Sequence, residues 1–163
     1  VTINNGMSMR AWYDIVGFDL QSRQDAAGVH ASVREIETLI AREHERGVPS
    51  ERIVLAGFSQ GGAIALAAGL CHAQKLAGIV ALSTYLPISE VVSRERHASN
   101  AATPIFWGHG TADPVVAMQR GVDSRDLLQS LGYTVAWHTY PMAHAVCAQE
   151  IADLRQWLGA RMA

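Results

Sequence analysis

The stretch IVLAGFSQGGAIALAAG, residues 53–69, contains a serine whose surroundings suit nucleophilic chemistry. Ser59 is the centre of a G-x-S-x-G pattern, with Gly57 two residues before it and Gly61 two residues after it. Between a buried strand and a helix, this pattern makes a sharp turn that exposes the hydroxyl, and the glycines keep Cβ atoms out of the crowded backbone. The backbone N–H of Gln60, at the start of the predicted helix, can face a developing oxyanion. The alternative is a chance serine in a glycine-rich turn.

A serine hydroxyl needs a base that takes its proton and a carboxylate that orients the base. Asp113 lies in WGHGTADPVV, after a predicted strand, and His144 lies in HTYPMAHAV, after the next one. The chain order serine, aspartate, histidine is the one expected when the serine occupies a strand-to-helix turn. The sequence therefore predicts Ser59 as nucleophile, Asp113 as acid and His144 as base.

Other carboxylates and imidazoles fit these roles less well. Asp123 and Asp126 fall on a predicted helix and are expected to face solvent. His109 comes before Asp113 and is expected to form a hydrogen bond within its own loop, and His138 lies inside a predicted strand, where a structural role is expected. The remaining histidines are expected on helices or polar loops in contact with solvent: His30, His44, His72 and His97.

Hydrophobic periodicity and turn residues define the elements that would position these side chains. Helical spacing predicts helices at 26–46, 60–70, 118–131 and 148–162, and apolar runs predict strands at 53–56, 76–82, 105–108 and 133–140, the last at an edge. Residues 83–103 are expected as a polar loop with a short helical patch, and residues 1–25 as irregular, with a turn at Asn5–Gly6. This alternation indicates an α/β domain with a mostly parallel sheet flanked by helices, and the chemistry of such sheets lies at the carboxyl ends of the strands.

The composition is that of a globular protein with a sizeable core. The chain has 163 residues, 49% hydrophobic and 17% charged, and its formal net charge of −2 gives no reason to expect nucleic acid. No apolar run reaches the ~20 residues of a membrane span and no signal peptide opens the chain, so stable membrane insertion is not expected. Cys71 and Cys147 could pair in principle but are too few for a disulfide framework, and both are expected as reduced thiols of a cytoplasmic protein. No group of His, Cys and Asp has zinc-site spacing, and Cys147 lacks the turn that would favour it as a nucleophile.

Four motifs together resemble the carboxylesterase and acyl-protein thioesterase family of small α/β-hydrolases: GFSQGG, ALSTYLP, HGTADPVV and YPMAH. The opening TINNGMSMRAWYDI extends the likeness, which looks nearest to the bacterial carboxylesterase branch. The resemblance implies hydrolysis of carboxylic esters or thioesters with short to medium acyl chains, without a metal or an organic cofactor, and it implies the same triad. It also suggests that Trp12, Leu86 and Val116 lie near the substrate groove. Ordinary core packing is the alternative for each of these three apolar residues.

The sequence departs from the family pattern in two places. Ala143 stands where the family often has glycine before the catalytic histidine. The family also has an amino-terminal strand that ends in a His-Gly motif, and the loop after it supplies a second oxyanion N–H beside the nucleophile strand. No His-Gly motif precedes residue 53, and the chain begins at Val1. We therefore expect residues 1–163 to form the catalytic carboxyl-terminal portion of an α/β-hydrolase domain, completed by a companion amino-terminal segment.

Three functions follow from these observations. A serine carboxylesterase that works through an acyl-enzyme is the leading hypothesis, and acyl-protein thioesterase or lysophospholipase activity is the nearest alternative because it uses the same triad. A non-catalytic binding module with this fold is the third hypothesis, favoured only by the missing oxyanion donor. The sequence leaves a homodimer open and does not identify the physiological substrate.

Overall fold

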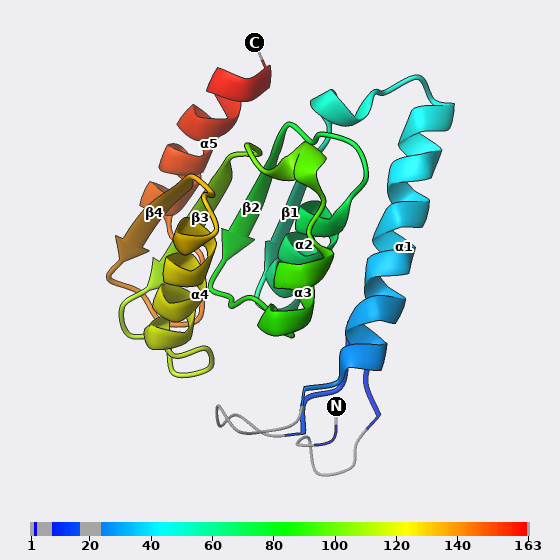
Figure 1. Ribbon diagram of the computed structural model, residues 1–163. Coiled ribbons are helices and arrows are strands. Elements are labelled where there is room, and N and C mark those ends of the chain that lie inside the picture. The colour runs from blue at the N-terminus through cyan, green and yellow to red at the C-terminus, as the bar shows by residue number, and fades with distance from the viewer. Residues whose placement is uncertain (1, 3–7, 17–23, 163) are drawn as a thin grey trace.

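The computed structural model describes residue 2 and residues 8–16 and 24–162 of the chain (Figure 1). Its four strands are β1 (Val54–Phe58), β2 (Gly78–Leu82), β3 (Ile105–Gly110) and β4 (Val135–Tyr140). They form one parallel sheet in the order β1-β2-β3-β4, so each crossover brings the chain to the next position in the sheet. The α/β fold with a parallel sheet, and the place of β4 at an edge, are therefore as predicted. The predicted Asn5–Gly6 turn lies outside the described residues.

Helices cover both faces of the sheet. The helices are α1 (Ala26–Glu45), α2 (Gln60–Cys71), α3 (Ser89–Glu95), α4 (Met118–Ser130) and α5 (Ala148–Met162), with short 3₁₀ turns at Ser50–Arg52 and Ala98–Asn100. The larger core cluster joins α1, α2, α3 and α4 to one face, and a smaller cluster joins α5 to the other (Figure 1). In the described part of the chain, no helix has the length and apolar character needed to cross a bilayer.

The central helix α2 lies close against the sheet because its residues are small. Residues 62–70 of this helix are all buried. A Cβ atom at Gly69 would lie 2.6 Å from Cδ1 of Ile79 on β2, a distance that real Cβ contacts do not reach. The alanines and glycines after Ser59 therefore fix the distance between α2 and the sheet, and with it the position of the serine at the start of the helix.

The strand that precedes Ser59 is less covered than the others. Within the described residues β1 pairs with β2 alone, and Ala56, in the middle of β1, is exposed. Val54 and Phe58 lie on the same side of β1 as Ala56 and pack at the margin of the α5 cluster. By contrast, every residue of β2 and β3 is buried. β1 thus has one sheet edge without a partner strand in the described structure.

Candidate active site

Ser59 occupies the turn between β1 and α2 in a strained conformation. Its φ is 54° and its ψ is −123°, a positive φ that costs a non-glycine residue about 1–3 kcal/mol. The surroundings hold this conformation from two sides. The Ser59 N–H donates to the carbonyl of Leu82 at 2.8 Å, and the Ser59 carbonyl accepts from the Ala63 N–H at 3.1 Å and from the Thr84 hydroxyl at 2.7 Å. The hydroxyl-bearing residue is therefore fixed at the carboxyl end of β1.

The glycine two residues before Ser59 is required by the backbone of α2. A Cβ atom at Gly57 would lie 2.1 Å from the carbonyl carbon of Gly61 and 2.4 Å from the nitrogen of Gly62. Both contacts are with backbone atoms at the start of a helix, which cannot rotate away as a side chain can.

We expect Gly57→Ala to lower the free energy of unfolding by about 3 kcal/mol or more, because the turn must open to admit the methyl group. This value is at the upper end of the usual destabilisation by overpacking. Gly159→Ala is the matched control on the exposed side of α5, where an added Cβ has no atom within 4 Å. Removing a glycine from a helix stabilises it by about 0.5–1 kcal/mol. Urea unfolding of both variants measures the difference, and equal stabilities would show that the turn has room for a side chain.

Asp113 lies in the loop after β3 with all of its side chain buried. Its Oδ1 accepts from the N–H groups of Val115 at 2.8 Å and Val116 at 2.9 Å, and its Oδ2 accepts from Nδ1 of His144 at 2.7 Å. Burial raises the pKa of this carboxyl, but the hydrogen bonds from His144 and from the two amides outweigh it, so the pKa lies below its ordinary value. Asp113 is therefore an ionised acceptor for the imidazole at neutral pH.

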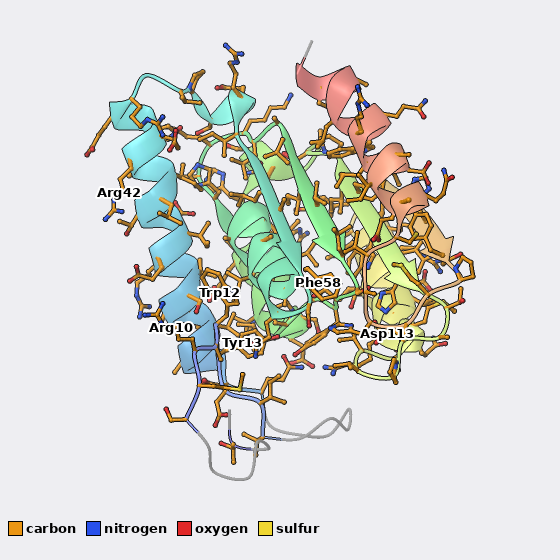
Figure 2. The ribbon with its side chains drawn as sticks, turned by 180° about the vertical axis from the view of Figure 1, so that it is seen from behind. Arg10, Trp12, Tyr13, Arg42, Phe58 and Asp113 are labelled. Atoms are coloured by element: carbon orange, nitrogen blue, oxygen red, sulfur yellow. The ribbon has the colours of Figure 1, made fainter. Side chains whose placement is uncertain are left out.

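His144 lies beside the residue that precedes Ser59. The ring centroids of His144 and Phe58 are 4.7 Å apart, and 17% of the His144 side chain is exposed. Since Nδ1 faces Asp113, Nε2 is the nitrogen left for a proton transfer. Figure 2 shows Phe58 and Asp113 at the end of the sheet where the strands terminate. The structure thus places Ser59, Asp113 and His144 at one end of the sheet, with Asp113 and His144 in direct contact.

The rival residues have structural surroundings. His109 is completely buried, and its Nε2 lies 2.9 Å from the carbonyl of Val116, which confirms the predicted hydrogen bond to its own loop. Burial lowers the pKa of His109, so this imidazole is neutral near pH 7. His138 lies in β4 and stacks on Phe106 with ring centroids 4.9 Å apart, and Asp123 is exposed on α4 as expected.

A second serine, histidine and acid meet at the opposite end of the sheet. Nε2 of His72 lies 3.4 Å from the hydroxyl of Ser50, and its Nδ1 lies 2.9 Å from both carboxylate oxygens of Glu37 on α1. The prediction that His72 faces solvent is therefore wrong, since only 5% of the residue is exposed. His44, also predicted to be solvated, is half-buried with Nε2 2.8 Å from the same hydroxyl. Packing of α1 against α2 encloses both imidazoles.

The geometry at Ser50 suits a structural role. Its hydroxyl proton goes to Oε1 of Gln74 at 2.6 Å, so it is not available to either imidazole. Ser50 precedes β1 and is 2% exposed, whereas the reactive groups of parallel sheets lie at the carboxyl ends of the strands. Ser50 begins a 3₁₀ turn of three residues, whereas Ser59 directly precedes the 12-residue helix α2.

The three predicted substrate-groove residues have different surroundings. Trp12 is 41% exposed, and its backbone N–H donates to Oε1 of Gln60 at 3.2 Å, while Nε2 of Gln60 donates to the carbonyl of Tyr13 at 3.0 Å. These two bonds hold the segment with Trp12 beside the start of α2 (Figure 2). Leu86 and Val116 are 4% and 6% exposed, so they belong to the packed interior behind the site.

The backbone N–H of Gln60 belongs to the first turn of α2. The first N–H groups of a helix have no acceptor within the helix, and they carry the positive end of its dipole. Because the Gln60 side chain is engaged with residues 12 and 13, its backbone N–H is the group that this residue can offer to an anion. Among the described residues, no group of three or more His, Cys, Asp or Glu side chains has metal-site geometry.

Sequence reasoning missed Glu150, which is fully buried in the first turn of α5. Neither of its carboxylate oxygens has a hydrogen-bond partner among the described residues, and a Cβ at Gly108 would lie 2.1 Å from its Oε1. Burial alone raises the pKa of Glu150 from its ordinary 4.5 to about 7. An acidic residue in a first helical turn is usually an exposed partner of the helix dipole, so the sequence carried no sign of this burial.

We expect Glu150→Gln to stabilise the protein at neutral and alkaline pH. Because the folded chain binds the Glu150 proton more tightly than the unfolded chain, the stability due to the protonated form is present below about pH 4.5 and is lost as the pH rises through about 7. The amide keeps the shape and has no charge to bury. The contribution of residue 150 should lower the melting temperature of wild type between about pH 5 and about pH 8. In Glu150→Gln this contribution should be the same at both pH values. Parallel pH profiles for the two proteins would contradict the assignment.

Known proteins resemble this chain over nearly its whole length. The model of the Phospholipase/Carboxylesterase family matches residues 1–161. Acyl-protein thioesterase 1 from Neurospora crassa is 44% identical over 172 residues, covering 99% of this chain and 69% of that protein. Acyl-protein thioesterase 1 from Yarrowia lipolytica is 42% identical, covering 97% of this chain and 71% of that protein. These relatives are fungal thioesterases, and they do not support the predicted nearness to the bacterial carboxylesterase branch specifically.

Solved structures give the same fold. Arabidopsis thaliana SOBER1 superimposes with a TM-score of 0.93 at 30% identity, covering 99% of this chain and 79% of that one. The Bacillus cereus carboxylesterase superimposes with a TM-score of 0.75 at 20% identity, covering 91% of this chain and 68% of that one, which supports the fold alone. The chain therefore belongs to the phospholipase/carboxylesterase family of serine hydrolases, and its fold is the α/β-hydrolase fold.

Proposed function

We propose that this protein cleaves acyl thioesters, as an acyl-protein thioesterase, and that it also cleaves carboxylic esters. The observation that carries the proposal is the hydrogen-bonded pair of His144 and Asp113, packed on Phe58 directly before the strained Ser59. The names of the fungal relatives favour the thioester over the carboxylesterase reading. The description of the family supports ester and lysophospholipid hydrolysis as the second candidate.

In the proposed reaction, Oγ of Ser59 attacks the acyl carbonyl while Nε2 of His144 takes its proton. Asp113 holds the other imidazole nitrogen and stabilises the imidazolium that forms. The oxyanion of the tetrahedral intermediate lies at the Gln60 N–H. The thiol or alcohol then leaves with the proton from His144, and water attacks the acyl-Ser59 ester by the same steps. Trp12 forms an outer wall for the acyl chain, and Leu86 and Val116 support the site from behind.

The substrate class is tested with matched acyl peptides and purified wild-type protein. One peptide carries an octanoyl group on cysteine, and the other carries it on serine; an octanoyl lysophospholipid is the third substrate. We expect the highest kcat/KM for the S-acyl peptide. A higher kcat/KM for the O-acyl peptide would instead indicate that the protein is a carboxylesterase. Binding of the peptides without turnover of any would support a non-catalytic module.

We further propose that a companion strand pairs with the free edge of β1 and supplies a second oxyanion N–H. Within the described residues β1 is apolar and has no partner strand on one side, and Ala56 on one of its faces is exposed. The two fungal relatives named above are also longer, since this chain spans 69% and 71% of their lengths. Loss of one oxyanion donor costs about 10²–10³ in kcat, so residues 1–163 alone should be weakly active. Full activity of a monomer of residues 1–163, equal to that of a form that includes the companion segment, would contradict this proposal. Dimerisation through β1 would show that the partner of this strand is a second copy of the same chain.

We also propose a cytoplasmic location. Cys71 and Cys147 both carry free thiols, which fits a reducing compartment.

A further inference from the structure

Thr84, in the loop after β2, contacts the turn that carries Ser59. It is completely buried, and its hydroxyl donates to the carbonyl oxygen of Ser59 at 2.7 Å, with the Tyr85 carbonyl farther away at 3.4 Å. Its methyl group packs on the start of α2, since a Cβ at Gly62 would lie 2.8 Å from Cγ2 of Thr84. The residue therefore fits closely against one particular peptide unit.

That peptide unit joins the Ser59 carbonyl to the Gln60 N–H. A peptide bond is planar and trans, so the direction of the carbonyl fixes the direction of the N–H on the other side of the plane. The Ala63 N–H approaches the same carbonyl at 3.1 Å as the first helical hydrogen bond of α2. The Thr84 hydroxyl adds a shorter hydrogen bond from the loop after β2, so the plane is held from this loop as well as from the helix.

We propose that Thr84 is a positioning residue whose hydroxyl orients the Gln60 N–H toward the oxyanion. The inference rests on the proposed function, in which this N–H stabilises the tetrahedral intermediate. A hydrogen bond to the carbonyl also polarises the amide, which makes its N–H a stronger donor. The orientation matters only when the oxyanion has formed, so Thr84 acts on kcat and leaves KM unchanged.

The chain offers a matched control. Thr103 is 1% exposed, and its hydroxyl donates to Oδ1 of Asn100 at 2.7 Å, at the amino end of β3 and far along the sheet from Ser59. Thr84→Val and Thr103→Val each remove one buried hydroxyl and keep the shape of the side chain. Thr84→Ser keeps the hydroxyl and removes only the methyl group.

We expect Thr84→Val to lower kcat for the S-acyl peptide by about 10- to 100-fold with KM unchanged, short of the loss of a whole oxyanion donor. Thr84→Ser should restore most of kcat, and Thr103→Val should leave kcat unchanged. Thr84→Val should also weaken inhibition by a trifluoromethyl ketone, which forms an oxyanion on Ser59, by the same factor. Melting temperatures should fall equally for the two valine variants.

A spectroscopic readout separates this inference from the proposed function. In ¹⁵N-labelled protein, the backbone amide resonance of Gln60 should shift in Thr84→Val and stay in place in Thr103→Val. A resonance that stays in place in both, or a kcat loss that is equal in both, would overturn the role of Thr84 even if wild type is active. A shifted resonance in a protein with no hydrolase activity would overturn the proposed function and, with it, the catalytic part of this inference.

Discussion

Replacing Ser59 with alanine is expected to lower kcat for thioester and ester hydrolysis by roughly 10⁴- to 10⁶-fold. Alanine removes the oxygen that would form the acyl-enzyme, and no other residue of the turn, residues 57–61, carries a hydroxyl group. The fold should persist, because the φ of 54° is imposed by bonds that the backbone makes to Leu82, Ala63 and Thr84. Single-turnover kinetics with the S-acyl peptide measures the loss, and circular dichroism checks the fold.

Ser50→Ala is the control that distinguishes the pair Ser59 and His144 from the pair Ser50 and His72. It removes the hydroxyl between His44 and His72, so it should lower the melting temperature and leave kcat per folded molecule unchanged. If Ser50→Ala abolished turnover and Ser59→Ala did not, the nucleophile would lie at the amino end of the sheet and the assignment of Ser59 would be wrong.

Replacing Asp113 with asparagine is expected to lower kcat by about 10⁴-fold. Oδ1 of Asp113 accepts two backbone N–H groups, from Val115 and Val116, so the oxygen of the new amide must remain on that side. The NH₂ group then faces Nδ1 of His144 and donates to it. This forces the His144 tautomer that carries its proton on Nε2. Nε2 then cannot accept a proton from Ser59.

The kinetic loss in Asp113→Asn should exceed any loss of stability. Asp123→Asn, on the exposed side of α4 with a hydrogen bond to Gln119, is the matched control and should leave kcat unchanged. Steady-state kinetics at neutral pH measures both variants. An Asp113→Asn protein with wild-type kcat would show that another group orients the imidazole.

Local sequence patterns predicted the sheet and placed the three candidate triad residues for a common reason. Each triad residue directly follows a strand or lies in the loop after one, and short apolar runs bounded by glycine or proline mark those strands. Parallel topology then brings the loops to one end of the sheet, so chain order was enough to expect Ser59, Asp113 and His144 together. The ring contact between His144 and Phe58 is a tertiary detail that no local pattern contains.

Burial imposed by distant elements could not be predicted in the same way. His72 and Glu37 are 35 residues apart and meet only because α1 packs on α2. Glu150 is enclosed between α5 and β3, where Gly108 leaves the space for its carboxyl group. Thr84 belongs to the ALSTYLP motif, and its contact with the Ser59 carbonyl depends on the pairing of β1 with β2. Ester and thioester cleavage use the same triad, so the motifs did not separate the two substrates.

Covalent labelling tests the central claim, that Ser59 is the nucleophile of a serine hydrolase, most directly. A fluorophosphonate probe forms a bond between its phosphorus and the serine oxygen, with fluoride leaving and the proton passing to the base. Intact mass and peptide mapping of wild type should show one probe on the peptide that contains Ser59. Labelling should disappear in Ser59→Ala and persist in Ser50→Ala. Labelling of a peptide that lacks Ser59, or labelling that survives in Ser59→Ala, would contradict the claim.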